Sequence, residues 1–141
     1  DHRDLHSFPP RRSSDLFDAV LVDAPCSALG TLRRHPEVRH RLSRAGLRRS
    51  GEVQAEILAS AAAFTRPGGR LVYSTCSFTH AENRDVVGAF LEAHPDFRHA
   101  APAQWPAPLR HLRGDDGIAR TWPAHPQVDG FGIALLTRSG A

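Results

Sequence analysis

The sequence predicts an α/β fold with a parallel sheet, because short apolar runs alternate with segments of helical periodicity. The apolar runs are residues 17–22, 71–73 and 130–137, and helical patterns cover residues 52–64 and 86–91. The order strand, helix, strand, helix, strand is typical of parallel strands that are connected by helices. Three strands are fewer than most open sheets contain, so we expect one strand edge and some apolar faces to lie uncovered.

The first run, FDAVLV at residues 17–22, is almost continuously apolar and stops at Asp23. Such a run is typical of a buried strand in a parallel sheet, and it places the Asp23 carboxylate at the carboxyl end of that strand. Residues 27–34 are expected to form a loop. Residues 35–49 are basic and only weakly helical, and we expect a break near Gly46.

A helix that starts at Glu52 is predicted next, because apolar residues recur at helical spacing. This face consists of Val53, Ile57, Leu58, Ala61 and Phe64. Residues 66–69 (RPGG) should end the helix, since glycine favours a helix terminus and proline does not continue a helix. Residues 71–73 then form the second buried strand.

Thr79 and Glu82 have the spacing of a capping box, which predicts the start of a second helix. The apolar face of this helix consists of Val86, Val87, Phe90 and Leu91, and the helix should end by Pro95. Residues 100–126 are rich in proline, alanine and glycine and predict no clear element. Trp105 and Trp122 in this region are expected to pack in a small secondary core.

Length and composition are those of a single globular domain: 141 residues, of which 40% are hydrophobic and 23% charged. No apolar run approaches the roughly 18 residues that span a bilayer, so no membrane contact is expected. Two cysteines and scattered histidines predict neither a disulfide scaffold nor a metal site. All 18 basic residues are arginines and the net charge is +3, which favours a polyanionic partner.

The chain contains no methionine, and we interpret it as a fragment of a longer protein. Residues 1–16 show no helical or strand periodicity, and residues 6–16 are similar to the conceptual translation of a common sequencing adapter, with Pro10 as a departure. We therefore interpret residues 1–16 as adapter-derived and residues 17–141 as native. The alternative is a native linker rich in proline, arginine and serine.

The only two cysteines follow the two predicted parallel strands, in the sequences DAPCS (residues 23–27) and STCS (residues 74–77). Ligands of open α/β sheets bind beyond the carboxyl ends of the strands. If these strands are neighbours, Cys26 and Cys76 face the same crevice. The alternative is that both are buried as small hydrophobic residues, the usual environment of cysteine.

These motifs resemble those of the RNA (cytosine-5) methyltransferases of the Nol1/Nop2/Sun family. Residues 23–30 (DAPCSALG) resemble the fourth family motif, and residues 73–77 (YSTCS) with residues 81–83 (AEN) resemble the sixth. The similarity extends through residues 33–37 (RRHPE), 67–70 (PGGR) and 129–131 (DGF), and RRHPE is most similar to the bacterial branch that modifies small-subunit ribosomal RNA. The resemblance implies that residues 17–141 are the C-terminal part of a Rossmann-like methyltransferase domain that lacks its first strands and its glycine-rich cofactor motif.

The resemblance also implies a reaction, the transfer of a methyl group from S-adenosylmethionine to C5 of a cytosine in ribosomal RNA. It assigns Cys76 as the nucleophile that adds to C6, Cys26 as the residue that assists release, and Asp23 as a contact of the cofactor and base. The residues alone do not order the cysteines, and DNA cytosine methyltransferases use a Pro-Cys cysteine as nucleophile. The reverse order is therefore an alternative, as is an Asp23 that only shapes the turn before Pro25.

A basic cluster follows the Cys26 motif, with seven arginines, two histidines and one acid between residues 33 and 49. Such a cluster neutralises phosphates, and we expect RNA contacts from Arg33, Arg34, His35, Arg39 and Arg41. The alternative is a solvated helix face. Phe78 and His80, near Cys76, are candidates for stacking on a base.

Three other functions remain open: a thiol redox protein, a noncatalytic RNA-binding module, and a generic S-adenosylmethionine-dependent methyltransferase with a different substrate. The first lacks a Cys-x-x-Cys motif, and the last leaves the second cysteine unexplained. The family resemblance implies a monomeric full-length enzyme in the bacterial cytoplasm. Without the cofactor motif, this part alone is expected to be inactive and marginally stable.

Overall fold

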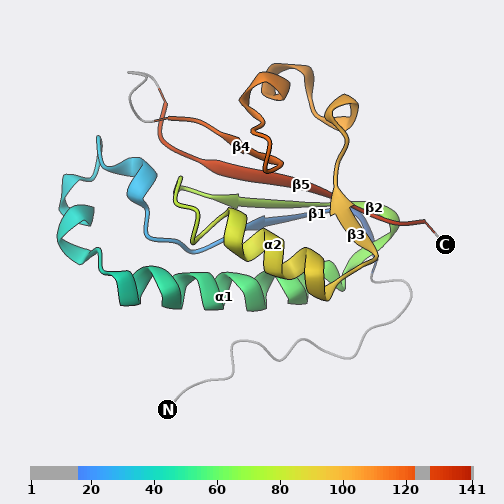
Figure 1. Cartoon of the computed structure of the whole chain (residues 1–141), viewed down its shortest axis with the longest axis horizontal. Helices are drawn as coiled ribbons and strands as arrows, with labels where there is room; N and C mark the ends of the chain where they lie inside the picture. The colour runs from blue at the N-terminus through green and yellow to red at the C-terminus, as the bar shows by residue number, and fades with distance from the viewer. Residues whose placement is uncertain (1–15, 123–127, 141) are drawn as a thin grey trace, which may run out of the picture.

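The computed structural model describes residues 16–122 and 128–140, so nearly all of the segment expected to be adapter-derived lies outside the described residues. The strands are β1 (Phe17–Asp23), β2 (Thr65–Thr75), β3 (Phe97–His99), β4 (Ile118–Arg120) and β5 (Gly132–Arg138), and the α-helices are α1 (Arg44–Ala62) and α2 (Arg84–Ala93). Short 3-10 helices lie between them: η2 (Leu29–Thr31), η3 (Pro36–Arg41), η4 (Pro102–Gln104) and η5 (Ala107–Leu112). None of the described helices is long and apolar enough to cross a membrane. The α/β class is confirmed (Figure 1).

The strands form one sheet in the order β1-β2-β5-β3, and β4 also pairs with β5. β1 and β2 are parallel, whereas β5 is antiparallel to β2, β3 and β4. The expectation of a parallel sheet is therefore right for the β1–β2 pair and wrong for β5. The Gly130 N–H, just before β5, donates to the Gly30 carbonyl at 2.8 Å, in the loop that follows β1. Because β5 starts at the carboxyl ends of β1 and β2, it runs in the opposite direction.

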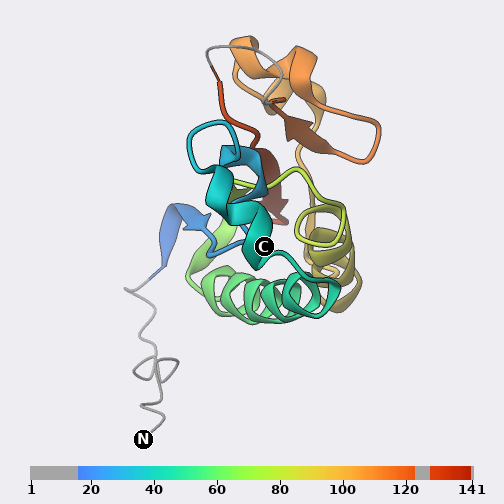
Figure 2. The same cartoon turned by 90° about the vertical axis from the view of Figure 1, so that its left-hand side faces the viewer.

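The sheet is covered on both faces at its centre. Helices α1 and α2 pack side by side under one face, and the segment with η4 and η5 lies over the other (Figures 1 and 2). Leu71 and Tyr73 of β2 lie in the core on the helix side, while Val72 between them packs against the core that contains Trp105. This alternation is the period of a β-strand. The predicted α2 face is also confirmed, since Val86, Val87 and Phe90 are buried and Leu91 packs against the same core.

Strand β1 lies where the sequence predicts it, but the expectation that it is buried is wrong. Phe17 is 57% exposed and Leu21 is 68% exposed, whereas Val22 is buried against the helices. β1 is the last strand of the sheet and pairs with β2 alone among the described residues. The expectation of a strand edge and apolar face without cover is confirmed here.

Helix α1 begins at Arg44, well before the expected start at Glu52, and continues through Gly46 without a break. Ser43 is the N-cap residue, and its Oγ accepts a hydrogen bond from the Gly46 N–H at 2.9 Å. This cap satisfies a donor that the first turn of a helix leaves without a partner. Side-chain capping therefore starts the helix at a position where the apolar pattern gives no signal.

Strand β2 begins at Thr65 and contains the RPGG sequence that is expected to form a turn. The register with β1 shifts between the pairs Phe17–Thr65 and Ala19–Arg70, which marks an irregularity in β2. Gly68 within it has a φ of 76°, a conformation that glycine adopts without steric cost. Gly68 therefore allows a local irregularity within β2, whereas we expected a turn before this strand.

The capping box between Thr79 and Glu82 is only half formed. The Glu82 N–H donates to Thr79 Oγ1 at 3.3 Å, but the Thr79 N–H donates to Ser77 Oγ and not to the Glu82 carboxylate. Helix α2 begins later, at Arg84, after Asn83 as the N-cap residue. The Glu82 side chain is turned toward the Cys26 loop.

Candidate active site

Cys26 and Cys76 meet at the carboxyl ends of β1 and β2. Their Sγ atoms lie 3.0 Å apart, within hydrogen-bonding distance, and both thiols are free and half-buried. Because β1 and β2 are adjacent and parallel, the loops that leave them lie side by side. The two thiols therefore meet at one edge of the sheet, as predicted for neighbouring strands. The alternative, that both are buried as small hydrophobic residues, does not fit two half-buried thiols in contact.

Backbone hydrogen bonds join the two cysteine loops. The Ala24 N–H donates to the Ser74 carbonyl at 2.9 Å, and the Gly30 N–H donates to the Cys76 carbonyl at 2.9 Å. Between these two bonds Ala28 adopts a left-handed conformation, with φ 59° and ψ 22°. Residues with a Cβ atom rarely adopt it. The loop from residue 24 to residue 30 therefore folds back against the Cys76 loop.

Glu82 is fully buried and binds the residue that follows Cys26. Its Oε1 accepts a hydrogen bond from the Ser27 N–H at 2.7 Å, and its Oε2 accepts one from the Ser27 hydroxyl at 2.6 Å. The Thr79 hydroxyl also donates to Oε2, at 3.2 Å. Each of these groups is a donor, as a carboxylate requires. A residue of the Cys76 motif thus holds the loop that carries Cys26.

Gln54 of α1 holds the other side of Cys26. This buried side chain donates from Nε2 to the Pro25 carbonyl at 2.9 Å and to Glu82 Oε1 at 3.2 Å. Pro25 and Ser27 flank Cys26, so both neighbours of the thiol are anchored. Sequence analysis did not predict this role for Gln54, because one polar residue on a helix has no periodic signal.

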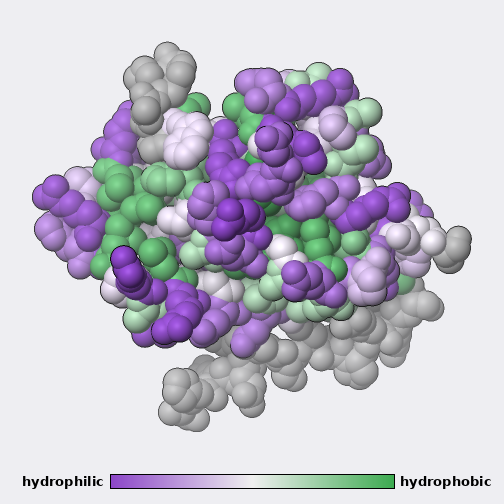
Figure 3. Space-filling model, in the orientation of Figure 1, coloured by the Kyte–Doolittle hydropathy of each residue, from purple (hydrophilic) through white to green (hydrophobic). Residues whose placement is uncertain are grey.

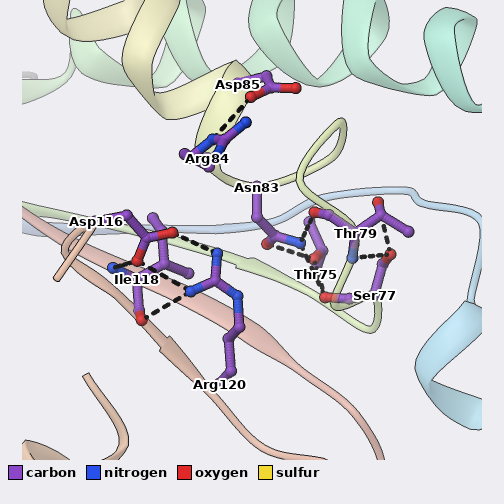
Figure 4. Close-up of polar contacts among 9 residues, drawn as sticks. All are labelled: Thr75, Ser77, Thr79, Asn83, Arg84, Asp85, Asp116, Ile118 and Arg120. Carbon is purple, nitrogen blue, oxygen red and sulfur yellow. Dashed lines mark hydrogen bonds and ion pairs between the residues drawn. The ribbon is translucent and has the colours of Figure 1, made fainter. Parts of the chain in front are cut away.

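Asn83 anchors the neighbours of Cys76 in the same way (Figure 4). Its Oδ1 accepts a hydrogen bond from the Thr75 hydroxyl at 2.9 Å, and its Nδ2 donates to the Ser77 carbonyl at 2.9 Å. Gly132 of β5 makes room for this side chain, since a Cβ atom at residue 132 would lie 2.0 Å from Asn83 Oδ1. Glu82 and Asn83, adjacent in the sequence, therefore contact different cysteine loops.

The surroundings of Cys26 favour its protonated thiol. Burial, first, and the hydrogen bond with Cys76, second, raise the pKa of Cys26 from 9.0 to about 12. The negative charge of Glu82 raises this pKa further, and a backbone hydrogen bond at Ala28 opposes the rise. A protonated thiol is a poor nucleophile, but it can donate its hydrogen to a neighbouring sulfur. The site therefore suits Cys26 to donation better than to attack.

Two hollows open beside Cys26, and an arginine lines each of them. The first has a volume of about 290 Å³ and is lined by Cys26, Arg41 and Leu47, among others. The second has a volume of about 500 Å³ and includes Cys26, Arg49 and Val53. In Figure 3 a hydrophilic rim lies at the left, over the segment between β1 and α1, with apolar surface inside it. Apolar surface with guanidinium groups suits a base and its phosphate.

The predicted RNA-contacting residues lie in the segment that contains η3. Arg33, Arg34, His35, Arg39 and Arg41 are all exposed. Arg34 forms an ion pair with Asp129, and Arg33 Nη2 lies 4.0 Å from the same carboxylate, whose side chain is only 8% exposed. Two of the arginines therefore contact the segment that leads into β5, while their side chains remain 46% and 58% exposed.

Asp23 and the aromatic residues lie around the same strand ends. The Asp23 side chain is exposed at the end of β1. Trp105 is buried in the secondary core as expected, but Trp122 is 56% exposed and its ring lies 5.4 Å from that of Phe78, centroid to centroid. The packing expected for Trp122 is wrong because this residue follows β4 and lies beyond that core. Among residues 16–122 and 128–140, no three His, Cys, Asp or Glu side chains gather as a metal ion requires.

The mixed α/β sheet is that of the Rossmann-like, S-adenosylmethionine-dependent methyltransferases. Two of the solved structures that are similar to it are PH0851 and NSun6. PH0851 has a TM-score of 0.77 and 38% sequence identity, with 86% of this chain and 27% of that chain covered. NSun6 from Pyrococcus horikoshii, solved with SFG, has a TM-score of 0.68 and 25% identity, with 86% of this chain and 30% of that chain covered.

Sequence comparison then defines the family. The model of the 16S rRNA methyltransferase RsmB/F family matches residues 1–137, and the chain belongs to this family. Ribosomal RNA small subunit methyltransferase B of Thermus thermophilus is 49% identical over 119 residues, which cover 84% of this chain and 29% of the relative. The probable ribosomal RNA small subunit methyltransferase B of Bacillus subtilis is 36% identical over 129 residues, covering 90% of this chain and 29% of the relative. The chain thus spans less than a third of these relatives.

Proposed function

We propose that the full-length protein containing this chain methylates C5 of a cytosine in small-subunit ribosomal RNA, through a covalent bond between Cys76 and C6. The distance of 3.0 Å between the two sulfur atoms carries this proposal. Methyl transfer to an amine or a hydroxyl group needs no thiol pair, whereas C5 of cytosine is a poor nucleophile that a thiolate can activate. The curated relatives act on ribosomal RNA of the small subunit, which supports the substrate.

The chemistry assigns one event to each sulfur. The Cys76 thiol first loses its proton to solvent, and the thiolate then forms a bond to C6. The electron pair of the C5–C6 double bond moves to C5, which would take the methyl group of the donor, and the donor would keep the electrons of its broken bond to that group. The C5 proton then passes to solvent, its electron pair restores the double bond, and the bond between C6 and Cys76 breaks with its electrons on sulfur.

Cys26 assists the last step. Its protonated thiol, 3.0 Å from Cys76, donates a hydrogen bond to the sulfur that leaves C6. This bond stabilises the departing thiolate, because hydrogen bonding to the charged form of a group favours that form. The raised pKa of Cys26, caused first by its burial, supports this assignment, since a thiol that keeps its proton is a poor nucleophile.

The methyl donor is proposed to be S-adenosylmethionine, which supplies an electrophilic methyl group when bound. NSun6 was solved with SFG, an analogue of this cofactor. Asp23 fits the donor because its exposed carboxylate, at the strand end beside the Cys26 loop, can bind an ammonium group. Most of the cofactor site is expected in the rest of the full-length protein, so the 141-residue chain alone is expected to be inactive.

RNA is proposed to lie over the η3 segment and the two hollows beside Cys26. Arg33, Arg34, His35, Arg39 and Arg41 provide exposed positive charge, and Arg41 also lines the smaller hollow. Such contacts hold the phosphate backbone without reading its sequence. We further propose that the enzyme acts as a monomer in the bacterial cytoplasm, where its ribosomal substrate is made.

The test uses the longest reading frame that contains this sequence. The purified protein is incubated with S-adenosylmethionine and with small-subunit RNA that contains 5-fluorocytosine, whose C5 fluorine blocks the final elimination. A denaturant-resistant adduct is expected in the wild type and in Cys26→Ala, and none in Cys76→Ala. An adduct that disappears only in Cys26→Ala would reverse the roles of the cysteines.

The same experiment separates the other candidate functions. A noncatalytic RNA-binding module would retain RNA but form no adduct and transfer no methyl group. A generic methyltransferase would bind the cofactor and form no adduct with any RNA. A redox protein would form no adduct and transfer no methyl group, and Cys26 and Cys76 would form a reversible disulfide whose reduction potential lies near that of cellular thiols.

A further inference from the structure

We propose that Glu82 and Asn83 are positioning residues that control the two cysteines separately: Glu82 sets the position of Cys26, and Asn83 sets that of Cys76. The consequences for the reaction rest on the proposed function. The placement of the two thiols does not, and it can be tested without RNA or cofactor.

Glu82 connects two loops that are distant in the sequence. Its carboxylate accepts both hydrogen bonds that Ser27 can donate, across 55 residues of sequence. Gln54 links the same carboxylate to the Pro25 carbonyl on the other side of Cys26. If the Glu82 oxygens are lost as acceptors, Ser27 loses both hydrogen bonds and Gln54, which holds Pro25, loses one of its own, so the sulfur is free to move away from Cys76.

A carboxylate is a costly choice for this position if only packing is needed. Glu82 is 0% exposed, and burial of a charged group destabilises a protein unless hydrogen bonds compensate. A nearer partner was available to this carboxylate, since the Thr79 N–H could donate to it and complete the capping box. The carboxylate is instead directed to the Cys26 loop, where its negative charge also disfavours the Cys26 thiolate.

Asn83 acts on the other loop. It accepts the Thr75 hydroxyl hydrogen and donates to the Ser77 carbonyl, and it has no hydrogen bond to the Cys26 loop among the described residues. The amide is neutral, so it places Cys76 without adding charge. The two neighbouring residues thereby bond to the flanks of different sulfur atoms, Glu82 to Ser27 and Asn83 to Thr75 and Ser77, although both also contact Thr79.

The catalytic test compares Glu82→Gln and Asn83→Ala in the full-length protein. We expect Glu82→Gln to resemble Cys26→Ala: the adduct with 5-fluorocytosine RNA still forms, turnover falls at least about tenfold, and adduct accumulates on unmodified RNA. We expect Asn83→Ala to resemble Cys76→Ala, with slower formation of the adduct itself. A purely structural role would lower adduct formation and turnover together, in proportion to the unfolded fraction.

Two further variants keep the test decisive. Ser27→Ala removes one of the two hydrogen bonds that Ser27 donates to Glu82 and leaves the buried carboxylate unchanged. Its turnover should therefore fall by less than that of Glu82→Gln, and the adduct should still form. Glu92→Gln makes the same chemical change at an exposed position of α2 and should leave every rate unchanged. A folded Glu82→Gln enzyme with turnover within twofold of wild type would overturn the proposal, as would one that no longer forms the 5-fluorocytosine adduct.

A second measurement requires no substrate. In a Cys76→Ser background, the alkylation of Cys26 by iodoacetamide is followed as a function of pH. Glu82→Gln should shift this profile to lower pH, because release of the loop exposes Cys26, whose burial is the largest cause of its raised pKa, and because the negative charge of Glu82 is removed as well. Asn83→Ala should leave the alkylation rate of Cys26 at each pH within about twofold of that of the background protein. An unshifted profile overturns the role of Glu82. If the wild type forms no adduct with any RNA, the proposed function fails and this profile still decides the positioning.

Discussion

The Cys26 thiol lies 3.0 Å from the Cys76 thiol, and each is anchored through its sequence neighbours by a different residue of the Glu82–Asn83 pair. This relationship joins the loops after β1 and β2 into one site. The family match places the chain in the 16S rRNA methyltransferase RsmB/F family. The hydrogen bonds explain how the chain holds the two sulfur atoms 3.0 Å apart.

The pH dependence of Cys26 alkylation is the first prediction. Its pKa is raised to about 12, so the thiolate is disfavoured in the folded protein. At pH 8, we expect iodoacetamide to alkylate Cys26 at least about 100-fold more slowly than an ordinary free cysteine. The rate should continue to rise above pH 9, where that of an ordinary thiol levels off. Peptide mass spectrometry distinguishes alkylation at Cys26 from alkylation at Cys76. In urea, Cys26 should react at the rate of an ordinary free cysteine.

Gly30→Ala should destabilise the chain. A Cβ atom at residue 30 would lie 1.7 Å from the Gly130 carbonyl oxygen, which is backbone and cannot rotate away. We expect the free energy of unfolding in urea to fall by roughly 1–3 kcal/mol. Gly88→Ala is the matched control, because residue 88 lies in α2 with open space around it. Gly88→Ala should stabilise the chain by about 0.5–1 kcal/mol. Equal effects of the two changes would contradict the close contact between Gly30 and Gly130.

The salt dependence of RNA binding tests the η3 segment. In the full-length protein, the double variant Arg39→Gln and Arg41→Gln should reduce the slope of log affinity against log salt by roughly 1.4, if each arginine contacts one phosphate of single-stranded RNA. Filter binding at several salt concentrations gives this slope. Arg98→Gln, at an exposed position of β3, is the control. A slope that does not change would assign these arginines to a solvated surface.

Leu21 tests whether the longer protein covers β1. Leu21 is 68% exposed, so Leu21→Ser should change the stability of the 141-residue chain by less than about 0.5 kcal/mol. In the full-length protein, where we expect further strands beside β1, the same change should cost roughly 1.5–3 kcal/mol. Leu58→Ala, at a fully buried position, should cost about 2–5 kcal/mol in both. An equal effect of Leu21→Ser in both proteins would show that this face remains exposed.

Several elements could be predicted because their signals are local. The apolar run before Asp23 predicted β1, and the spacing of Val86, Val87 and Phe90 predicted the buried face of α2. The burial of β1 and the direction of β5 were predicted incorrectly. Both features depend on residues that lie far away in the sequence. The burial of β1 depends on the strand beside it, and the direction of β5 depends on the contact between Gly30 and Gly130.

The sequence by itself determined the class of the fold, the places where the parallel strands end, and the two cysteines that follow them, because periodicity and short motifs record these features along the chain. Only the tertiary structure decided that Glu82 binds Ser27 and that Asn83 holds the Cys76 loop. A buried polar group forms hydrogen bonds with the donors or acceptors that the fold brings near, and no local sequence pattern predicts which residues those are. For Glu82 the local spacing favoured Thr79, but the strongest partner came from the loop of the neighbouring strand.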